Sequence, residues 1–316
     1  MMSYWQLLLL LLPVFALMGL GLGLRRGGWL TTEADASLLR LVVNLLYPCI
    51  IFEHVHANPA LRDPANLAWS PLVGFGTMAG GIMLCAYAAR VLGFTVGTDR
   101  RTFAFTAGIY NYSYITVPLM TALFGRGSLG VLFAHNVGAE VAIWVVGVLV
   151  LSGESWRQSW RQLLSPPVLA LVVAVAVNLT GLGPRVPEVL LAVVRPLAAC
   201  AIPLGLILSG ATMAEHVLGR PRELFERRTS LAAVGLRLGV LTGLFLLLAR
   251  YGPFSPDLKH VILVQAAMPA GFLPLVLVKH YGGHLLTAVR VVLAPVLASL
   301  LLTPLWLRLG LEWVGG

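Results

Sequence analysis

A cluster of polar side chains lies in the middle of an apolar stretch that runs from residue 103 to residue 125. The stretch is long enough to cross a bilayer and carries no charge, yet its centre holds Asn111, Tyr112 and Ser113, followed by Pro118. Irregular backbone is tolerated in lipid only where protein or water satisfies its N–H and C=O groups, so a broken segment indicates a cavity at mid-membrane. The Asn111 amide and the dipoles of helix ends could bind a carboxylate there. The alternatives are a proline kink in a packed bundle and an amide that satisfies freed carbonyls.

A second stretch, residues 261–282, has a similar centre. It carries Gln265 and is interrupted by Pro269 and Pro274. Paired interruptions in two halves of a chain point to a binding site between them. Gln265 and Asn44 are neutral and could either line such a site or link helices. The predicted substrate-binding residues are Asn111, Tyr112, Ser113, Pro118, Asn44, Gln265 and Pro269.

One carboxyl group lies deep in another apolar stretch. Glu140 is the only one of the 13 acidic residues more than two turns from a predicted span end, with Asn136 on the same helix face and His135 adjacent. Carboxylates in a membrane are costly and are usually paired, hydrated or functional. Glu140, His135 and Asn136 are therefore candidates for coupling solute movement to protons. The alternative is that Glu140 stays ionised against Arg195, Arg290 or water and only holds helices together.

Composition places the chain in a membrane. Hydrophobic residues make up 58% and charged residues 11% of the sequence, and the mean hydropathy is +0.87. The excess of 22 Lys and Arg over 13 acids lies mostly in short loops, where it orients membrane segments and gives no indication of nucleic acid. Cys49, Cys85 and Cys200 form no close pair, so neither a disulfide framework nor a zinc site is indicated, and no cofactor is expected.

Runs of about 20 apolar residues predict ten membrane spans joined by short connections. They cover residues 5–24, 36–56, 67–94, 102–124, 128–151, 162–181, 188–213, 229–250, 260–281 and 284–308. The odd-numbered loops carry 12 of the 22 Lys and Arg residues and the opposite side carries 6. Because positive loops stay in the cytoplasm, both termini are predicted to lie outside it, in a multi-pass protein of the cell (inner) membrane.

An internal repeat organises these spans. Arg40 and Pro48 recur as Arg195 and Pro203, a shift of 155 residues, and the two interrupted stretches correspond at a similar shift. The two arginines would share a structural role near helix ends, whereas Arg290 could guard an inner exit for anions. Five spans per half make the halves inverted copies. The predicted fold is an all-α integral membrane protein of ten transmembrane helices in two inverted five-helix repeats, residues 1–156 and 157–316, whose broken fourth and ninth helices cross at mid-membrane.

The same stretches resemble the auxin efflux carrier family in its short prokaryotic form, whose members are described as permeases for auxin-like acids, malate or malonate. The similarity runs over nearly the whole chain, through NLLYP (44–48), NYSYITVP (111–118), PLGLILSGA (203–211) and QAAMP (265–269). It implies a panel (scaffold) domain, a transport domain and an elevator-type movement. The family often has small polar residues after the ninth-span proline, where this chain has AGFL (270–273), which leaves the substrate and any sodium site open. Bile-acid-type sodium symporters share the broad architecture.

We therefore expect a carrier of a small organic anion, coupled to protons in preference to sodium. No Walker sequence, nucleophile elbow or zinc-helix motif occurs, so ATP-driven transport by this chain alone and an intramembrane enzyme are both disfavoured. A sodium-coupled symporter, a sensor and a channel remain as alternatives. The expected partners are the anion, protons and the lipid bilayer, without nucleic acid, and the oligomeric state is open between a monomer and a homodimer.

Overall fold

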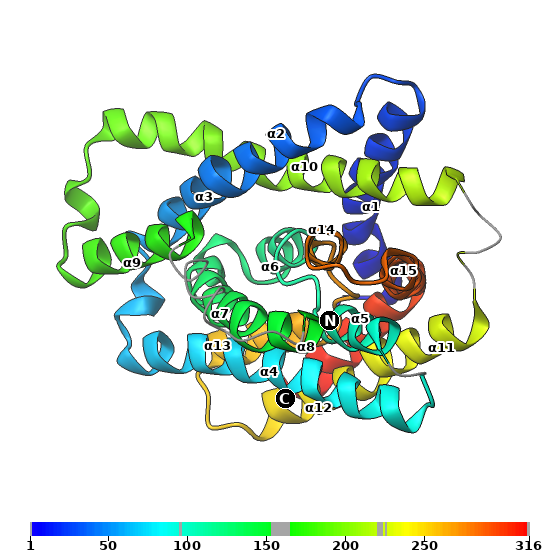
Figure 1. Ribbon diagram of the computed structural model, residues 1–316. Coiled ribbons are helices and arrows are strands. Elements are labelled where there is room, and N and C mark those ends of the chain that lie inside the picture. Colours follow the sequence, from blue (N-terminus) through cyan, green and yellow to red (C-terminus); the bar gives the residue numbers. More distant parts are fainter. Residues whose placement is uncertain (1, 95–96, 153–164, 220–223, 225, 315–316) are drawn as a thin grey trace.

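The computed structural model describes residues 2–94, 97–152, 165–219, 224 and 226–314, and these residues form helices (Figure 1). Π-helical turns at Val42–Leu46, Ile143–Gly147 and Leu236–Leu241 join α2 to α3, α7 to α8 and α11 to α12. The helices are α1 (Tyr4–Arg26), α2 (Thr32–Leu41), α3 (Tyr47–Val55), α4 (Pro64–Val91), α5 (Thr98–Gly108), α6 (Thr116–Phe124), α7 (Leu129–Ala142), α8 (Val148–Ser152), α9 (Pro166–Leu179), α10 (Glu188–Gly219), α11 (Arg227–Gly235), α12 (Thr242–Tyr251), α13 (Pro256–Ala266), α14 (Leu273–His280) and α15 (Leu285–Val314).

Seven of the described helical segments are long and apolar enough to cross a membrane, so the chain is a multi-pass membrane protein. They are Tyr4–Arg26, Thr32–Val55, Pro64–Val91, Arg126–Ser152, Glu188–Ala214, Arg227–Tyr251 and Leu285–Val314. The sixth predicted span corresponds to the 14-residue helix α9, although its first residues, 162–164, lie outside the described residues. The boundary between the predicted halves, at 156 and 157, also lies outside them. Ten spans in two inverted repeats remain a prediction.

Local sequence explains where several helices begin. Ser3 and Gln6 form a capping box at the start of α1, and the Ser255 hydroxyl accepts the Leu258 N–H at the start of α13, where Pro256 occupies the first helical position. Asp63 caps α4 in the same manner, since its carboxylate accepts the Ala65 N–H. These caps satisfy helix-end N–H groups that would otherwise lack partners.

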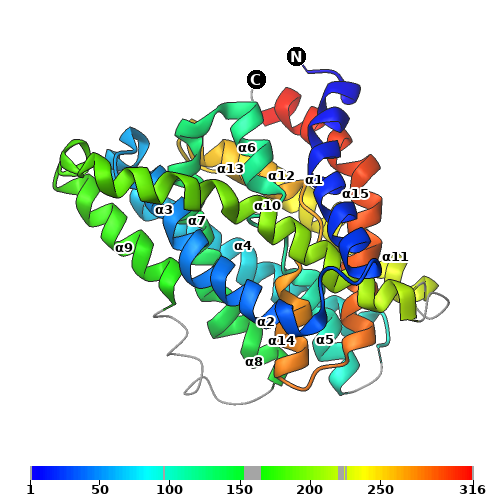
Figure 2. The ribbon, with the colours of Figure 1, turned by 90° about the horizontal axis from the view of Figure 1, so that it is seen from above.

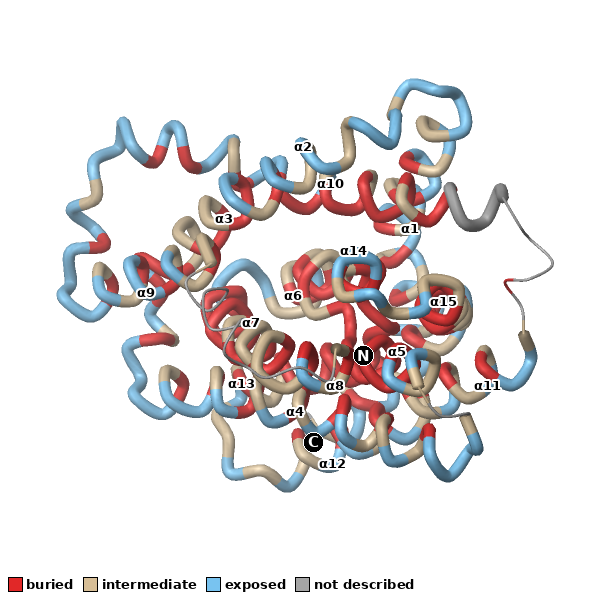
Figure 3. The backbone as a smooth tube through the Cα atoms, viewed as in Figure 1, coloured by how far each residue is buried: buried red, intermediate tan, exposed pale blue. Residues whose placement is uncertain are grey.

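The helices form two layers (Figures 1 and 2). The upper layer in Figure 1 contains α1, α2, α3, α9 and α10, in which α1 packs along α10, and α3 packs against α9 and α10. The lower layer contains the remaining helices. Helix α1 begins and α15 ends at the same end of the molecule (Figure 2). In Figure 3 the buried residues concentrate in the lower layer and between the layers, whereas α9 and α2 are mostly exposed or half-exposed. Because many exposed side chains of the upper layer are apolar, we assign its outer surface to lipid.

Glycines allow helices within each layer to touch through their backbones. A Cβ atom on Gly21 of α1 would lie 1.9 Å from the Ile207 carbonyl oxygen of α10, and one on Gly210 of α10 would lie 1.9 Å from the Met18 oxygen. Gly74 and Gly138 bring α4 and α7 together in the same way within the lower layer. Such close approach through small residues is a common way for helices to associate in membranes.

The fourth and ninth predicted spans each consist of two helices separated by an interruption. Helix α5 ends at Gly108 and α6 begins at Thr116, whereas α13 ends at Ala266 and α14 begins at Leu273. The intervening residues, 109–115 and 267–272, are mostly buried between the helices of the lower layer. We refer to these two segments together as the crossing.

Candidate functional site

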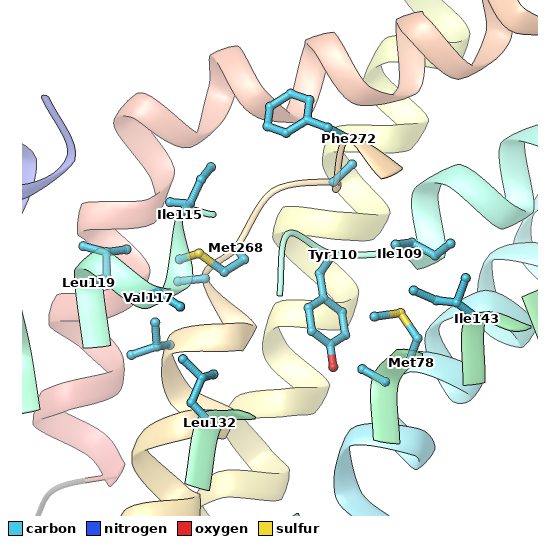
Figure 4. Packing of buried hydrophobic residues seen from close by; sticks show 14 of the residues in the cluster. Met78, Ile109, Tyr110, Ile115, Val117, Leu119, Leu132, Ile143, Met268 and Phe272 are labelled. Carbon is cyan, nitrogen blue, oxygen red and sulfur yellow. The ribbon is translucent and has the colours of Figure 1, made fainter. Parts of the chain in front are cut away.

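The two segments of the crossing hydrogen-bond to each other. The Asn111 N–H donates to the Pro269 carbonyl over 2.8 Å, and the Gly271 N–H donates to the Ile109 carbonyl over 2.9 Å. Tyr110 and Ala270 thereby form a short antiparallel bridge. Figure 4 shows Tyr110, Met268 and Phe272 gathered at this point among buried apolar side chains. Each interruption therefore satisfies part of the backbone that the other leaves free, as interrupted helices inside a membrane require.

The carbonyls at the end of α13 are also satisfied, largely by one buried arginine. Arg237 donates through Nε to the Met268 carbonyl over 2.8 Å and through Nη2 to those of Gln265 and Ala266 over 3.0 and 3.3 Å. The Thr242 hydroxyl donates to the Ala266 carbonyl and the Thr303 hydroxyl to that of Ala267. Sequence reasoning missed Arg237, although an arginine eight residues inside a predicted span was a signal of the same kind as Arg290.

Amide side chains hold the other interruption. The Gln265 Nε2 donates to the Asn136 Oδ1 over 3.1 Å and to the Tyr112 carbonyl over 3.2 Å. The Asn136 Nδ2 donates to that same Tyr112 carbonyl over 2.8 Å, and the Thr116 hydroxyl donates to the Gln265 Oε1. Gln265 and Asn136 thus satisfy backbone and side-chain groups at the crossing, and neither is among the residues that line the cavity described next.

A cavity of about 660 Å³ lies between the two layers and reaches the crossing. Its volume is within the range that is usual for small-molecule sites. It is lined by α2, the first interruption, α7, α10 and the second interruption with α14. Six aromatic residues contribute to its wall, namely Tyr47, Tyr110, Tyr112, Tyr114, Trp144 and Phe272. The wall is therefore mainly apolar and aromatic.

The predicted site residues divide into two groups. Asn111, Tyr112, Ser113 and Glu140 line the cavity. His135, Asn136, Gln265, Pro269 and Pro118 lie elsewhere, most of them buried near the crossing, and Asn44 is exposed. Tyr47, three residues after Asn44, lines the cavity instead, and its hydroxyl hydrogen-bonds to that of Ser113 across the layers.

The Asn111 side chain is the main polar group of the cavity at the crossing. Its Oδ1 accepts the Ile115 N–H over 3.2 Å and so orients the amide. Its Nδ2 is buried and has no hydrogen-bond partner within the described residues, while the side chain as a whole is 3% exposed. A buried donor without a partner requires an explanation, because it costs about 1–3 kcal/mol. A ligand acceptor in the cavity would satisfy it.

A helix N-terminus lies on the same wall. Gly271, Phe272 and Leu273 line the cavity where α14 begins. The first N–H groups of a helix carry partial positive charge and favour anions. In α14, Pro274 has no N–H and the Leu275 N–H donates to the Phe272 carbonyl, so the helix end offers the Leu273 N–H. This group and the Asn111 amide suit the inner end of the cavity to a carboxylate.

Glu140 lies in the cavity wall on α7. The Ser165 hydroxyl donates to its Oε1 over 3.1 Å, and Ser165 is the residue before α9 in the upper layer. Arg195 pairs with Glu188 instead, so it is not the partner of Glu140 among the three that the alternative interpretation offered, which were Arg195, Arg290 and water. His135 is fully buried, and its Nδ1 lies 3.4 Å from the Asn136 Oδ1.

Arg290 lies away from the cavity lining, near Glu226. The Thr229 hydroxyl and backbone N–H groups hold the pKa of Glu226 below its usual range, and Arg290 adds to this effect. Arg40 is exposed on α2. Among the described residues, no three His, Cys, Asp or Glu side chains gather as metal ligands.

The outer part of the cavity is bordered by α2 and by the end of α14. Asp35 of α2 is paired with Arg25, and Lys279 of α14 also lines the cavity. No carboxylate of the described part of the chain pairs with Lys279. This end of the cavity therefore carries one cation that is not neutralised by a neighbouring acid.

Comparison with known proteins identifies the kind of protein. A family model described as membrane transport protein matches the chain twice, over residues 7–159 and 156–307. The chain is also 27% identical over 306 residues to an uncharacterized transporter of Methanothermobacter thermautotrophicus, and this similarity covers 93% of the chain and 95% of that relative.

Proposed function

Because the chain belongs to this family of membrane transport proteins, we propose that it is a secondary transporter that carries a small organic anion across the bilayer. The observation that carries the proposal is the unpartnered Asn111 Nδ2 at the inner end of the cavity, beside the N-terminus of α14. Both groups favour a carboxylate over a cation.

The cavity wall favours an acid with an aromatic or apolar body. Lys279 is the one cationic side chain among the lining residues, and it lies at the outer end, whereas aromatic rings surround the inner part. Burial of an apolar ligand surface against such rings is favourable. A second carboxylate would find hydroxyl groups there but no second cation to balance its charge. An auxin-like aromatic monocarboxylate therefore fits better than malate or malonate.

The two layers support an elevator-type movement. In the proposed topology of ten spans, α1, α2 with α3, α9 and α10 form the panel, and the lower layer with the crossing moves against it. The two successive family matches support two repeats, residues 1–156 and 157–316. The cavity is bordered by the start of α2 and the end of α14. With both termini outside the cytoplasm, these helix ends lie on the cytoplasmic side, so the cavity opens toward the cytoplasm.

Protons are the coupling ion in this proposal, and Glu140 is the group that exchanges them. Its position in the cavity wall and its hydrogen bond to Ser165 of the other layer support this role. A sodium site would need several free oxygen ligands. The carbonyls of residues 265–269 instead accept hydrogen bonds from Arg237, Thr242, Thr303 and Asn111. Sodium coupling, as in bile-acid-type symporters, is thereby the second candidate.

Counterflow in proteoliposomes tests the proposed function. Vesicles preloaded with unlabelled indole-3-acetate should accumulate external labelled indole-3-acetate transiently, and preloaded malate should support this exchange weakly. A channel would equilibrate the label without overshoot, and a sensor would leave it outside. Absence of counterflow with any member of a panel of aromatic and dicarboxylic acids would contradict the anion carrier.

A further inference from the structure

The largest fully buried side chain of the described residues is Arg237, which has no role in the proposal above. It lies in the π-helical turn Leu236–Leu241 of the lower layer and is 0% exposed. No Asp or Glu of the described chain pairs with it, and its Nη1 has no hydrogen-bond partner there. A buried charge is costly unless the protein compensates it, so a structure that keeps one without a counter-ion has a use for it.

The compensation comes from the crossing itself. Three carbonyls at the end of α13 accept hydrogen bonds from the guanidinium, and a helix C-terminus carries partial negative charge. The guanidinium also lies over two rings, with its Cζ 5.1 Å from the ring centre of Tyr110 and 5.3 Å from that of Phe245. These groups stabilise the cation without cancelling its charge.

Arg237 contacts both segments of the crossing. It binds the Met268 carbonyl of one segment and the Tyr110 ring of the other. The next residues along the chain are Pro269 and Asn111, which hydrogen-bond to each other over 2.8 Å. Arg237 thus contacts the residue that precedes each partner of this hydrogen bond, Met268 before Pro269 and Tyr110 before Asn111.

We propose that Arg237 is a positioning residue whose fixed positive charge makes the crossing selective for anions. The inference rests on the proposed function, since it concerns the same site. A path of two hydrogen bonds and one residue, on the order of 10 Å, separates the guanidinium from the Asn111 backbone. At that distance and an effective dielectric constant of about 20, one charge changes the binding constant of an anion by about tenfold.

The test compares an acid with its uncharged amide. Purified protein is titrated with indole-3-acetate and with indole-3-acetamide, and the ratio of the two dissociation constants is the readout. We expect wild-type protein to prefer the acid by about tenfold or more, and Arg237→Gln to reduce that preference by about tenfold. Arg237→Lys carries the charge at a pH low enough to keep the buried amine protonated, and there it should keep the preference within about threefold. Thr303→Val removes a neutral hydrogen bond to the adjacent Ala267 carbonyl and should leave the ratio unchanged.

Each result decides the matter. An undiminished preference in Arg237→Gln, or an equal loss in Arg237→Lys at that pH, would overturn the electrostatic role. If Arg237→Gln does not fold, Arg237→Lys alone decides by the same criterion, and misfolding of both variants would assign Arg237 to folding only. Wild-type protein that binds both compounds equally, or neither, would contradict the proposed function itself, whereas a wild-type preference that persists without the charge contradicts only the inference about Arg237.

Discussion

The ring of Tyr114 lies directly against the backbone of Gly205, where a Cβ atom would come within 2.0 Å of the ring carbon Cε1. Tyr114 belongs to the first interruption in the lower layer, and Gly205 belongs to α10 in the upper layer. Both residues line the cavity. The missing side chain at position 205 therefore determines how closely the layers approach beside the site.

Gly205→Ala should displace the Tyr114 ring. Because overpacking of a close contact costs about 1–3 kcal/mol, we expect a lower thermal unfolding temperature and weaker binding of indole-3-acetate. Gly19→Ala is the matched control, since no atom lies within 4 Å of a Cβ built at that position of α1. Restoration of stability by adding Tyr114→Leu to Gly205→Ala would establish the clash as the cause. Equal stability of Gly205→Ala and Gly19→Ala would refute it.

Asn111→Ala should weaken substrate binding. The variant removes the buried, unpartnered Nδ2 donor of a residue that lines the cavity, and a hydrogen bond to a charged acceptor is worth about 1.5–3 kcal/mol, or about tenfold or more in the dissociation constant. Asn44→Ala is the control, because Asn44 is exposed and outside the cavity lining. Binding and counterflow with indole-3-acetate measure both variants. If Asn111→Ala binds and exchanges indole-3-acetate as the wild-type protein does, Asn111 is not part of the binding site.

Glu140→Gln should separate exchange from accumulation. The amide keeps the shape and hydrogen bonding of the side chain but cannot take up or release a proton at physiological pH. We expect counterflow to persist and accumulation driven by a pH gradient to be lost. Ser165→Ala, which removes the hydrogen bond to Glu140 and leaves the carboxyl titratable, should still accumulate the substrate. Accumulation by Glu140→Gln, or uptake that follows a sodium gradient at fixed pH, would disprove proton coupling through Glu140.

The proposed orientation can be tested by labelling. In a background without Cys49, Cys85 and Cys200, Thr212→Cys places a thiol in the cavity wall, and Ser3→Cys places one before α1. A membrane-impermeant maleimide should react with the first from the cytoplasmic side and with the second from outside, because the Arg-rich loops are cytoplasmic. Indole-3-acetate should protect the Thr212→Cys thiol. Reaction from the reverse sides would invert the topology.

The sequence alone determined the class of protein and the interrupted backbone. Composition and apolar length indicate a membrane protein, because only apolar helices can satisfy their backbone in lipid. Whether a helix continues depends on local backbone geometry, which local sequence features such as prolines control. These features are the prolines at 118, 269 and 274 and the polar residues at 111–113. The interruptions in α5–α6 and α13–α14 were therefore predictable, as was the placement of Asn111 within the first interruption and of Glu140 near the middle of the Arg126–Ser152 segment.

Only the tertiary structure decided which side chains meet. Asn44 was expected at the site, but this span lines the cavity through Leu39, Val43 and Tyr47, which are four residues apart, and Asn44 lies one residue beyond that face. Asn44 is exposed and Tyr47 faces the cavity. Arg237 donates hydrogen bonds to carbonyls at least 28 residues away in the chain. The Ser165 hydroxyl donates to Glu140, which is 25 residues away on another helix. Spacing within a helix cannot specify such contacts, because they depend on how separate helices pack and rotate against one another.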